Sequence, residues 1–263
     1  MPVPAMPASF DLTGKRALVT GSGQGVGAAI AATLAAAGAE VVVNDLVAER
    51  AELGAAELRE QGLAAVAAAF DVTDHAAVAA AIEQVGGVDI LINNAGNAGG
   101  DGWAGRGPFH KSEPSEWARF INVNLYGVMN CTHAAVPVMI ERKWGRVITI
   151  ISDAGRVGEA NLAAYAAGKG GAGAFTRAIA HELGRYNVTA NNISLGTMRT
   201  PLTEPLWANA SEEQTKAILG RYLVRRPGLP ADVCGLALLL ASDAGEWITA
   251  QTVPLNGGYS SAL

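Results

Sequence analysis

The residues best suited to proton transfer are a tyrosine and a lysine in the middle of the chain, Tyr165 and Lys169. A spacing of four places both side chains on one face of a helix, where the phenol and the ammonium can meet. A free phenol has a pKa near 10 and is a poor base at neutral pH. One ammonium about 4 Å away, at an effective dielectric constant of about 20, supplies roughly 4 kcal/mol, which is about 3 pH units. The pair predicts a phenol that exchanges protons near neutral pH, although the same spacing is common on exposed helices.

A glycine-rich segment near the start of the chain, Thr20–Gly27, follows one apolar run and opens a helix-like stretch. Glycine permits positive φ, and a missing side chain lets the backbone approach a pyrophosphate at the positive end of a helix. Asp45 closes the next apolar run, where a carboxylate accepts hydrogen bonds from an adenosine ribose. Together they predict a dinucleotide site. The alternatives are a tight turn in a packed α/β protein and an ordinary turn residue at Asp45.

The kind of dinucleotide depends on the charges around that ribose. The Asp45 carboxylate would repel the 2′-phosphate of NADP, and no arginine or lysine lies at Ser22–Gln24 or just after Asp45 to receive it. We therefore expect NAD to be preferred over NADP. Asp71–Val72 and Asn93–Gly96 close the third and fourth apolar runs, where the adenine ring and the cofactor sugars would pass. Aspartate, asparagine and glycine are also common in turns for purely local reasons.

Short apolar runs alternate with longer amphipathic stretches along the chain, which predicts an α/β fold. Near-continuous apolar character is typical of parallel strands covered on both faces, and the alternation indicates a Rossmann-type doubly wound sheet of about seven strands. The predicted strands are Arg16–Thr20, Glu40–Asn44, Ala64–Phe70, Asp89–Ile92, Arg146–Ile151, Val188–Ser194 and Gln251–Pro254. The predicted helices are Gly25–Ala37, Ala48–Gln61, Asp74–Val85, Glu116–Arg142, Leu162–Arg185 and Pro230–Ala241.

Two long stretches, Asn97–Ser115 and Leu195–Leu229, interrupt this alternation. Both follow strands, and long loops in compact domains are usually functional, so we expect them above the carboxyl ends of the sheet. Pro254 donates no ladder hydrogen bond, so the last strand should lie at an edge or finish early. We expect a flexible N-terminal arm at residues 1–11 and a single catalytic domain at 12–263, with a substrate loop or lid at about 195–229.

The composition argues against several other classes of function. Half of the 263 residues are hydrophobic, the net charge is −5 and the pI is about 5.4, which gives no support for a nucleic-acid or membrane-surface partner. No apolar run is long enough to span a bilayer, and Met1–Phe10 lacks the pattern of a signal peptide, so we expect a cytoplasmic protein. Cys131, Cys234 and the four histidines show no metal-ligand spacing, so no metal is expected.

In combination these motifs resemble the short-chain dehydrogenase/reductase family, with a likeness that extends over residues 12–258. The family's Thr-Gly-x-x-x-Gly-x-Gly segment is Thr20–Gly27, its Asn-Asn-Ala-Gly segment is Asn93–Gly96 and its Tyr-x-x-x-Lys pair is Tyr165–Lys169. Two positions depart from the pattern. Leu195 replaces a common proline, and Ala250 replaces a glycine that is frequent before the last strand.

The resemblance also implies a role for each residue of the site. Tyr165 exchanges a proton with the substrate oxygen while a hydride moves between the substrate carbon and nicotinamide C4. The family's catalytic serine falls on Ser152, which would stabilise the charge on that oxygen. Lys169 would lower the pKa of Tyr165 and bind the nicotinamide ribose, and Asn124 would hold a water that links Lys169 to solvent. The implied cofactor contacts, besides Tyr165 and Lys169, are Gly21, Gly23, Gln24, Gly25, Val26, Gly27, Asp45, Leu46, Asp71, Val72, Asn94, Ala95, Gly96, Gly196, Met198 and Thr200.

The substrate class is inferred from the segment after Ser152. This segment, which contains Asp153, Arg156 and Glu159, resembles the corresponding segment of reductases that act on hydroxyacyl or oxoacyl thioesters, so we expect an acyl-CoA or acyl-ACP substrate. Basic residues that could meet a CoA phosphate, or could simply be solvated, are Arg106, Lys111, Arg199, Arg221, Arg225 and Arg226. Residues that could instead line a pocket for a steroid or another apolar alcohol are Trp103, Phe109, Leu206 and Trp207.

The predicted helix Leu162–Arg185 bears on how the chain assembles. Alanine and glycine occur on several faces of Leu162–Arg185, which suits either close contact between subunits or tight packing on its own sheet. Family members are commonly dimers or tetramers, so we expect a homo-oligomer, with a homotetramer favoured. A dinucleotide-binding sensor or scaffold remains the alternative to an enzyme, but it would need Asp45 and the glycines without the polarised phenol of Tyr165.

Overall fold

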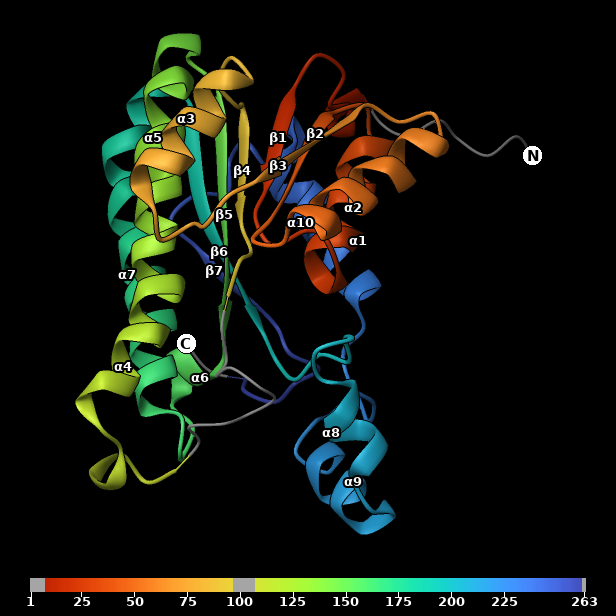
Figure 1. Cartoon of the computed structure of the whole chain (residues 1–263), viewed down its shortest axis with the longest axis vertical. Helices are drawn as coiled ribbons and strands as arrows, with labels where there is room; N and C mark the ends of the chain where they lie inside the picture. Colours follow the sequence, from red (N-terminus) through yellow and green to blue (C-terminus); the bar gives the residue numbers. More distant parts are fainter. Residues whose placement is uncertain (1–7, 97–106, 262–263) are drawn as a thin grey trace.

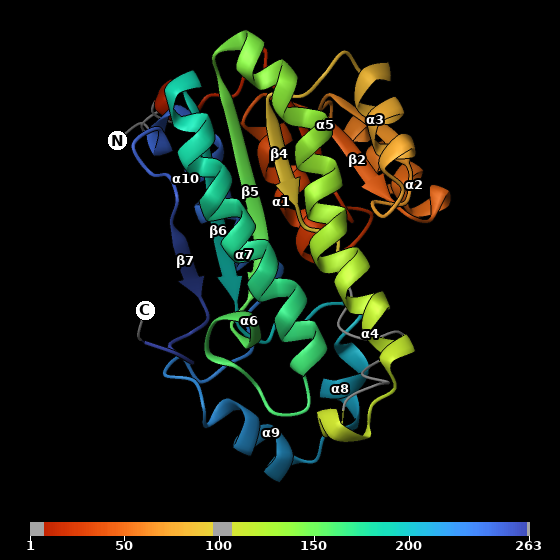
Figure 2. The same cartoon turned by 90° about the vertical axis from the view of Figure 1, so that its left-hand side faces the viewer.

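The computed structural model describes residues 8–96 and 107–261. In these residues seven parallel strands form one sheet in the order β3-β2-β1-β4-β5-β6-β7. The strands are β1 (Arg16–Val19), β2 (Glu40–Asp45), β3 (Ala65–Ala69), β4 (Ile90–Asn93), β5 (Gly145–Ser152), β6 (Val188–Leu195) and β7 (Thr252–Leu255). Helices cover both faces of the sheet (Figures 1 and 2), which confirms the Rossmann-type α/β fold.

The two helical layers each bury one side of the sheet. One layer contains α1 (Gly25–Ala36), α2 (Ala48–Glu60) and α10 (Pro230–Ala241), and the other contains α3 (His75–Gln84), α5 (Gly127–Arg142) and α7 (Ala163–Leu183). A separate hydrophobic cluster fills the space on each side of the strands. Because both faces are covered, Ala17–Val19 of β1 and Ile90–Ile92 of β4 are buried, and this explains why these strands read as continuous apolar runs instead of alternating with polar residues.

The predicted edge position of the last strand is confirmed. β7 pairs with β6 and ends the sheet, so the Pro254 nitrogen removes no hydrogen bond from a central ladder. Ala250, just before β7, has a φ of 59°. This is the left-handed region that favours glycine, which accounts for the glycine that is frequent at this position in the family.

Two regions differ in detail from the predicted elements. The predicted helix Glu116–Arg142 begins earlier, as α4 (Pro114–Ile121), passes through a π-helical turn at Asn122–Tyr126 and continues as α5. The stretch 195–229, expected as a loop or lid, contains α8 (Glu204–Asn209) and α9 (Glu212–Leu219), which lie beyond the carboxyl ends of the strands (Figure 1). Of the other long stretch, Asn97–Ser115, residues 97–106 fall outside the described part of the chain.

The described residues hold neither a membrane-spanning helix nor a cluster of metal ligands. None of their helices combines the length and apolar character that a bilayer crossing requires. The same residues contain no group of three or more His, Cys, Asp or Glu side chains placed to hold a metal ion.

Candidate active site

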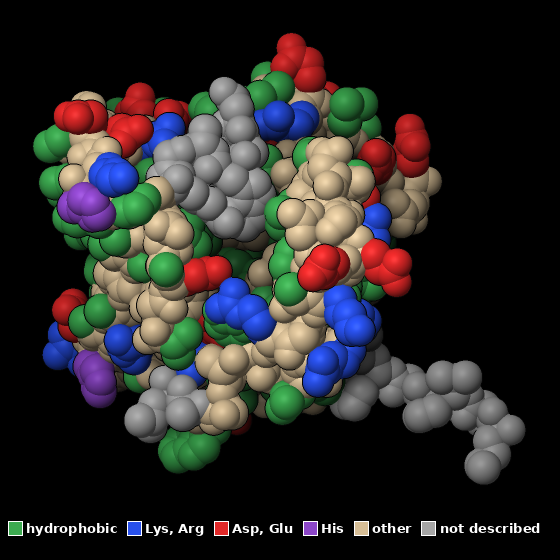
Figure 3. All heavy atoms as spheres, turned by 90° about the horizontal axis from the view of Figure 1, so that it is seen from below, with side chains coloured by type: hydrophobic (Ala, Val, Ile, Leu, Met, Phe, Trp, Pro, Cys, Tyr) green, Lys and Arg blue, Asp and Glu red, His purple; other side chains and the backbone are tan. Residues whose placement is uncertain are grey.

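A cleft of about 380 Å³ opens at the carboxyl ends of β1, β2 and β4. Figure 3, which views this end of the molecule, shows the surface hollowed near its centre with acidic and basic side chains around the hollow. The predicted cofactor contacts that line the cleft are Gly21, Gln24, Gly25, Val26, Gly27, Asp45, Leu46, Asp71, Val72, Asn94, Ala95, Gly96 and Thr200. Ligands bind in this place in doubly wound folds, at the ends of strands that feed helices on opposite faces.

The glycine loop presents an uncapped helix end to the cleft. Gly21 and Gly25 have φ values of 62° and 64°, which allow the tight turn from β1 into α1. Gln24 precedes α1, and its side chain makes no capping hydrogen bond. The backbone N–H groups of the first helical turn therefore keep their hydrogen-bonding capacity for a ligand. Together with the positive end of the helix dipole, this arrangement fits the pyrophosphate of a dinucleotide.

Gly27 packs too tightly for any side chain. A Cβ atom there would lie 2.5 Å from both Asn94 Nδ2 and the Gly21 carbonyl oxygen, and Asn94 Nδ2 itself donates hydrogen bonds to the Thr20 and Gly21 carbonyls at 2.9 and 3.0 Å. We expect Gly27→Ala to displace the loop, to destabilise the fold by about 1–3 kcal/mol and to weaken dinucleotide binding severely. Urea unfolding and quenching of tryptophan fluorescence by the dinucleotide measure the two effects.

The matched control is Gly235→Ala in α10, because a Cβ atom there would meet nothing within 4 Å. This substitution should stabilise the protein by about 0.5–1 kcal/mol and leave dinucleotide binding unchanged. If Gly27→Ala bound the dinucleotide as well as the control does, the glycine loop would not be the pyrophosphate site.

The end of β2 carries an ion pair that the sequence argument did not anticipate. Asp45 is 4% exposed, and its Oδ1 accepts hydrogen bonds from the Val47 N–H at 3.0 Å and from Arg50 Nε and Nη2 at 3.0 and 2.7 Å. Arg50 lines the same cleft. The prediction considered only the positions next to Asp45 and so missed this cation. The available signal was the start of α2 at Ala48, which brings the third residue of the helix back over the end of the strand.

Lys169 is held beneath the cleft in a buried position. It is 5% exposed, and its Nζ donates a hydrogen bond to the Ile150 carbonyl at 2.8 Å. Burial lowers the pKa of Lys169 to about 8, so the ammonium is still the main form at neutral pH. A Cβ atom on Gly96 would lie 3.0 Å from Lys169 Nζ and 3.2 Å from Asn124 Oδ1. Gly96 therefore leaves open the space into which both polar groups point.

Asn124 reaches this space from the π-helical turn. It is completely buried, and its Nδ2 donates to the Phe120 carbonyl at 2.9 Å. Gly168 of α7 lets the turn approach, because a Cβ atom there would lie 3.1 Å from both Asn124 Cβ and the Phe120 carbonyl oxygen. π turns occur often at functional sites. The glycine just before Lys169 thus serves the packing of the chain on itself.

Ser152 is the last residue of β5, and its Oγ accepts a hydrogen bond from the Ala154 N–H at 3.2 Å. The following short helix α6 (Ala154–Val157) packs backbone to backbone on α7. A Cβ atom on Gly155 would lie only 2.7 Å from the Gly170 nitrogen. This close approach brings the strand end that carries Ser152 to the helix that carries Tyr165 and Lys169.

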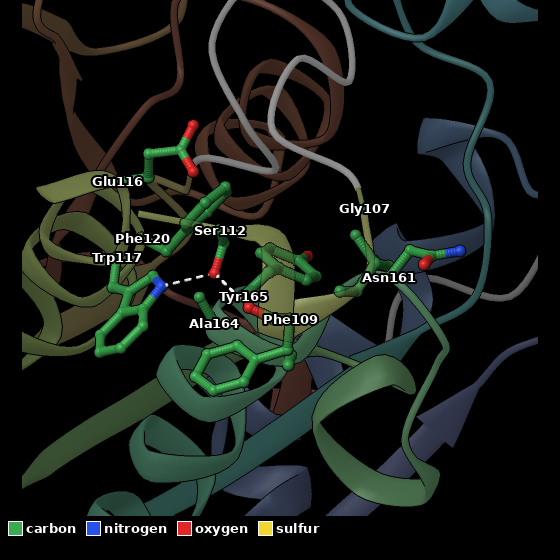
Figure 4. A pocket seen from close by; sticks show the side chains of 11 residues that line it. Gly107, Phe109, Ser112, Glu116, Trp117, Phe120, Asn161, Ala164 and Tyr165 are labelled. Carbon is green, nitrogen blue, oxygen red and sulfur yellow. Dashed lines mark hydrogen bonds between the residues drawn. The ribbon is translucent and has the colours of Figure 1, made fainter. Parts of the chain in front are cut away.

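Tyr165 lines a small pocket of about 20 Å³ next to this convergence (Figure 4). Phe109 stacks on Trp117 with ring centroids 5.0 Å apart, and Trp117 Nε1 donates to Ser112 Oγ at 2.8 Å. Asn161 adds an amide to the same wall. Of the residues considered for an apolar pocket, Phe109 lies here, Trp207 and Leu206 lie on α8, and Trp103 falls outside the described residues.

Besides Tyr165 and Lys169, three of the predicted cofactor contacts do not line the main cleft. Gly23 is next to Asp45, since a Cβ atom there would be 2.7 Å from Asp45 Oδ2. Gly196 and Met198 line a different cavity of about 200 Å³.

The residues that suggested a thioester substrate are largely bound to other parts of the protein. Asp153 and Arg156 form a buried ion pair at 2.9 Å. Exposed ion pairs hold Arg199 to Glu204 and Arg226 to Asp232, and Arg221 contacts Tyr259 and, at 3.8 Å, Glu159. Arg106 falls outside the described residues, and Lys111 and Arg225 are exposed.

The buried lysine gives a pH-dependent prediction. The folded chain holds the pKa of Lys169 at about 8, against 10.5 ordinarily, so the unfolded chain binds the proton more tightly. The stability of the cofactor-free protein should therefore rise between pH 8 and 10.5, by about 3 kcal/mol in total for this group. We expect this increment to be missing in Lys169→Met. Urea unfolding across that pH range, referred to the exposed Lys216→Met control, measures it, and parallel curves for the wild type and Lys169→Met would contradict it.

The comparisons with known proteins agree with this geometry. A family model described as short chain dehydrogenase matches residues 15–211. The chain is 36% identical to a 5-keto-D-gluconate 5-reductase of Escherichia coli over 97% of this chain and 98% of that protein. It is 35% identical to a 3-oxoacyl-(acyl-carrier-protein) reductase of Pseudomonas aeruginosa, covering 95% and 98%.

Among solved structures, the chain resembles a gluconate 5-dehydrogenase from Burkholderia cenocepacia in complex with NADP and tartrate. The TM-score is 0.89 and the identity 37%, over 97% of this chain and 98% of that one. The glycine loop, the Asn-Asn-Ala-Gly segment, Asn124, Ser152, Tyr165 and Lys169 thus occur in a seven-stranded fold whose relatives along its full length are dehydrogenases and reductases. The chain belongs to the short-chain dehydrogenase/reductase family and is an NAD(P)-dependent oxidoreductase.

Proposed function

We propose that the protein interconverts a secondary alcohol and a ketone on a small hydroxy acid of the sugar-acid type, with Tyr165 as the acid and base. The observation that carries the proposal is that Tyr165 lies one helical turn from the buried Lys169, whose ammonium points into the space that Gly96 leaves open at the cleft. When bound, the nicotinamide ring supplies or accepts the hydride. The cleft residues described above would hold the cofactor, with Asp45 favouring NAD through the adenosine ribose.

The chain's own residues then manage the substrate oxygen and its proton. The Tyr165 hydroxyl gives up or takes the proton at that oxygen, and Ser152 Oγ donates a hydrogen bond to it. The charged Lys169, whose ammonium persists at neutral pH, stabilises the phenolate form of Tyr165. Asn124, buried next to the space above Gly96, would position a water through which Lys169 exchanges its proton with solvent.

Polar groups in the pocket at Tyr165 support a hydroxylated substrate. Ser112, Glu116 and Asn161 lie in its wall and can form hydrogen bonds with the hydroxyl groups of a sugar-type substrate, most of which a steroid lacks. The similarity to the 5-keto-D-gluconate reductase and to the gluconate dehydrogenase bound to tartrate points the same way.

An oxoacyl or hydroxyacyl thioester is the second candidate. It is supported by the 35% identity to the 3-oxoacyl-(acyl-carrier-protein) reductase over nearly the whole chain. Against it, Arg199, Arg221 and Arg226 are engaged with other side chains of the protein, so they would have to leave these partners to bind a CoA phosphate.

A substrate panel tests the proposal. Formation and loss of NADH or NADPH absorbance should be followed with gluconate and 5-ketogluconate, an acetoacetyl thioester, a hydroxysteroid and simple secondary alcohols. The proposal predicts the highest kcat/KM with a sugar acid. A higher value with the thioester would favour the second candidate, and dinucleotide binding without turnover of any compound would favour a sensor or scaffold.

Assembly, location and domain limits remain expectations of the sequence. Several glycines of α7 are needed for packing within the chain itself, since Gly171 packs against Leu125 and Gly173 against Ile151. We propose a homo-oligomer because members of the family are commonly dimers or tetramers, and the mass measured by light scattering tests this. A cytoplasmic location and a single catalytic domain over residues 12–263 are likewise proposals.

A further inference from the structure

The hydrogen bonds of the Asp45–Arg50 pair involve only one of the two Asp45 carboxylate oxygens. Asp45 Oδ1 accepts three hydrogen bonds, from Val47 N–H and from two nitrogens of Arg50. Asp45 Oδ2 faces the glycine loop, where a Cβ atom on Gly23 would be 2.7 Å from it. Among the described residues no hydrogen bond reaches Oδ2. A carboxylate oxygen without a donor, on a side chain that lines the cleft, is a position for a ligand hydroxyl.

Arg50 also keeps part of its binding capacity. Its side chain is 42% exposed at the rim of the cleft, whereas the Asp45 side chain is only 6% exposed. Nε and Nη2 are directed at Asp45, which leaves the N–H groups of Nη1 for a second anion. Arginine recognises phosphate through such a fork of donors. The guanidinium also offsets the negative charge of Asp45, which would otherwise repel a phosphate at this place.

We propose that Arg50 is a specificity-determining residue that lets this site accept NADP as well as NAD, by binding the 2′-phosphate next to Asp45. With NAD, the 2′-hydroxyl donates to Asp45 Oδ2 and Arg50 stays on Oδ1. With NADP, the phosphate oxygens take the outer N–H groups of Arg50, whose positive charge lowers the repulsion between the phosphate and Asp45. This inference rests on the proposed cofactor site and deepens it.

The test is a binding measurement that needs no turnover. Calorimetric titration of the wild type, Arg50→Ala and Arg59→Ala with NAD, NADP, adenosine 5′-monophosphate and adenosine 2′,5′-bisphosphate isolates the contribution of one phosphate. Arg59 is the matched control, since it lies on the same helix, is 44% exposed and pairs with Glu52 outside the cleft. Its loss removes the same charge from the protein.

Arg50→Ala should weaken the binding of NADP and of the bisphosphate at least about tenfold, since hydrogen bonds to charged groups are lost. It should change the affinity for NAD and for the monophosphate less than about threefold. Arg59→Ala should change none of them by more than about threefold. Asp45→Asn should act in the opposite direction, tightening NADP and weakening NAD. Thermal melting of each variant confirms that it is folded. Arg50→Lys keeps the positive charge without the planar fork of donors, and it provides a second variant in case Arg50→Ala misfolds. It should lose less affinity for NADP than Arg50→Ala does.

Two results would overturn the inference while leaving the proposed function intact. One is an equal loss of NAD and NADP affinity in Arg50→Ala, which would make the residue a support for Asp45 alone. The other is a wild type that binds NAD but neither NADP nor the bisphosphate. A wild type that binds no dinucleotide at all would overturn the proposed function as well, and so the two failures are distinguishable.

Discussion

Tyr165→Phe should lower kcat by about a hundredfold to ten-thousandfold on any substrate that the wild type turns over, because a general acid and base contributes that much. The phenyl ring keeps the volume of the side chain, so the pocket with Phe109 and Ser112 keeps its shape. Only the oxygen that exchanges the proton is removed. Steady-state kinetics in both directions measure the loss.

The expected pattern separates this role from a structural one. Dinucleotide affinity and thermal stability of Tyr165→Phe should stay close to those of the wild type, since Tyr165 lines the substrate pocket and not the main cleft. Tyr186→Phe, beyond the far end of α7, is the matched control and should retain full activity. Turnover by Tyr165→Phe at the rate of that control would remove the phenol from the mechanism.

Asp153→Asn should destabilise the protein by about 3–5 kcal/mol, the usual result of breaking a buried ion pair from one side. Asp153 is 2% exposed, and its partner Arg156 has a side chain that is 9% exposed. Oδ1 also accepts from Ser194 Oγ at 2.7 Å, and Oδ2 accepts from Asn256 Nδ2 at 2.5 Å and Ser260 Oγ at 2.8 Å. An asparagine amide would place its N–H groups against some of these donors and would remove the carboxylate charge that faces Arg156.

Urea unfolding measures this loss, and Glu204→Gln supplies the control. It neutralises one partner of the exposed pair with Arg199, which contributes little because water and salt screen it. Asp153 directly follows Ser152 and ties the strand end to residues 256–260 near the C-terminus. We therefore expect kcat to fall in Asp153→Asn as well, with Asp153 as a positioning residue. A loss of stability no larger than in Glu204→Gln would contradict this account of the network.

The network around Asp153 also shows where sequence reasoning stopped. The sequence placed Asp153, Arg156 and Glu159 near Ser152 correctly, but their chemistry suggested contacts with a substrate. In the fold, Asp153 binds Ser194, Asn256 and Ser260, which are 41 to 107 residues away in the chain. No local pattern encodes such partners, because they meet only after β5, β6 and the segment after β7 have assembled.

Other features were within reach of the sequence. The apolar runs located all seven strands to within about one residue, because strands covered on both faces are mostly apolar. The start of α4 at Pro114 had a signal in Glu113 and Glu116, which form a capping box around a proline in the first turn. The π turn at Asn122–Tyr126 was not predicted from the sequence. The position of Arg50 required the start of α2 to be known first.

The most direct test of the central claim is a spectroscopic titration of the Tyr165 phenol. The difference in phenolate absorbance between the wild type and Tyr165→Phe, both saturated with NAD, isolates this one group as the pH is raised. The account predicts an ionisation midpoint well below that of an ordinary phenol, since the buried ammonium of Lys169 stabilises the phenolate. A midpoint at or above about 10, the value of an ordinary phenol, would contradict it.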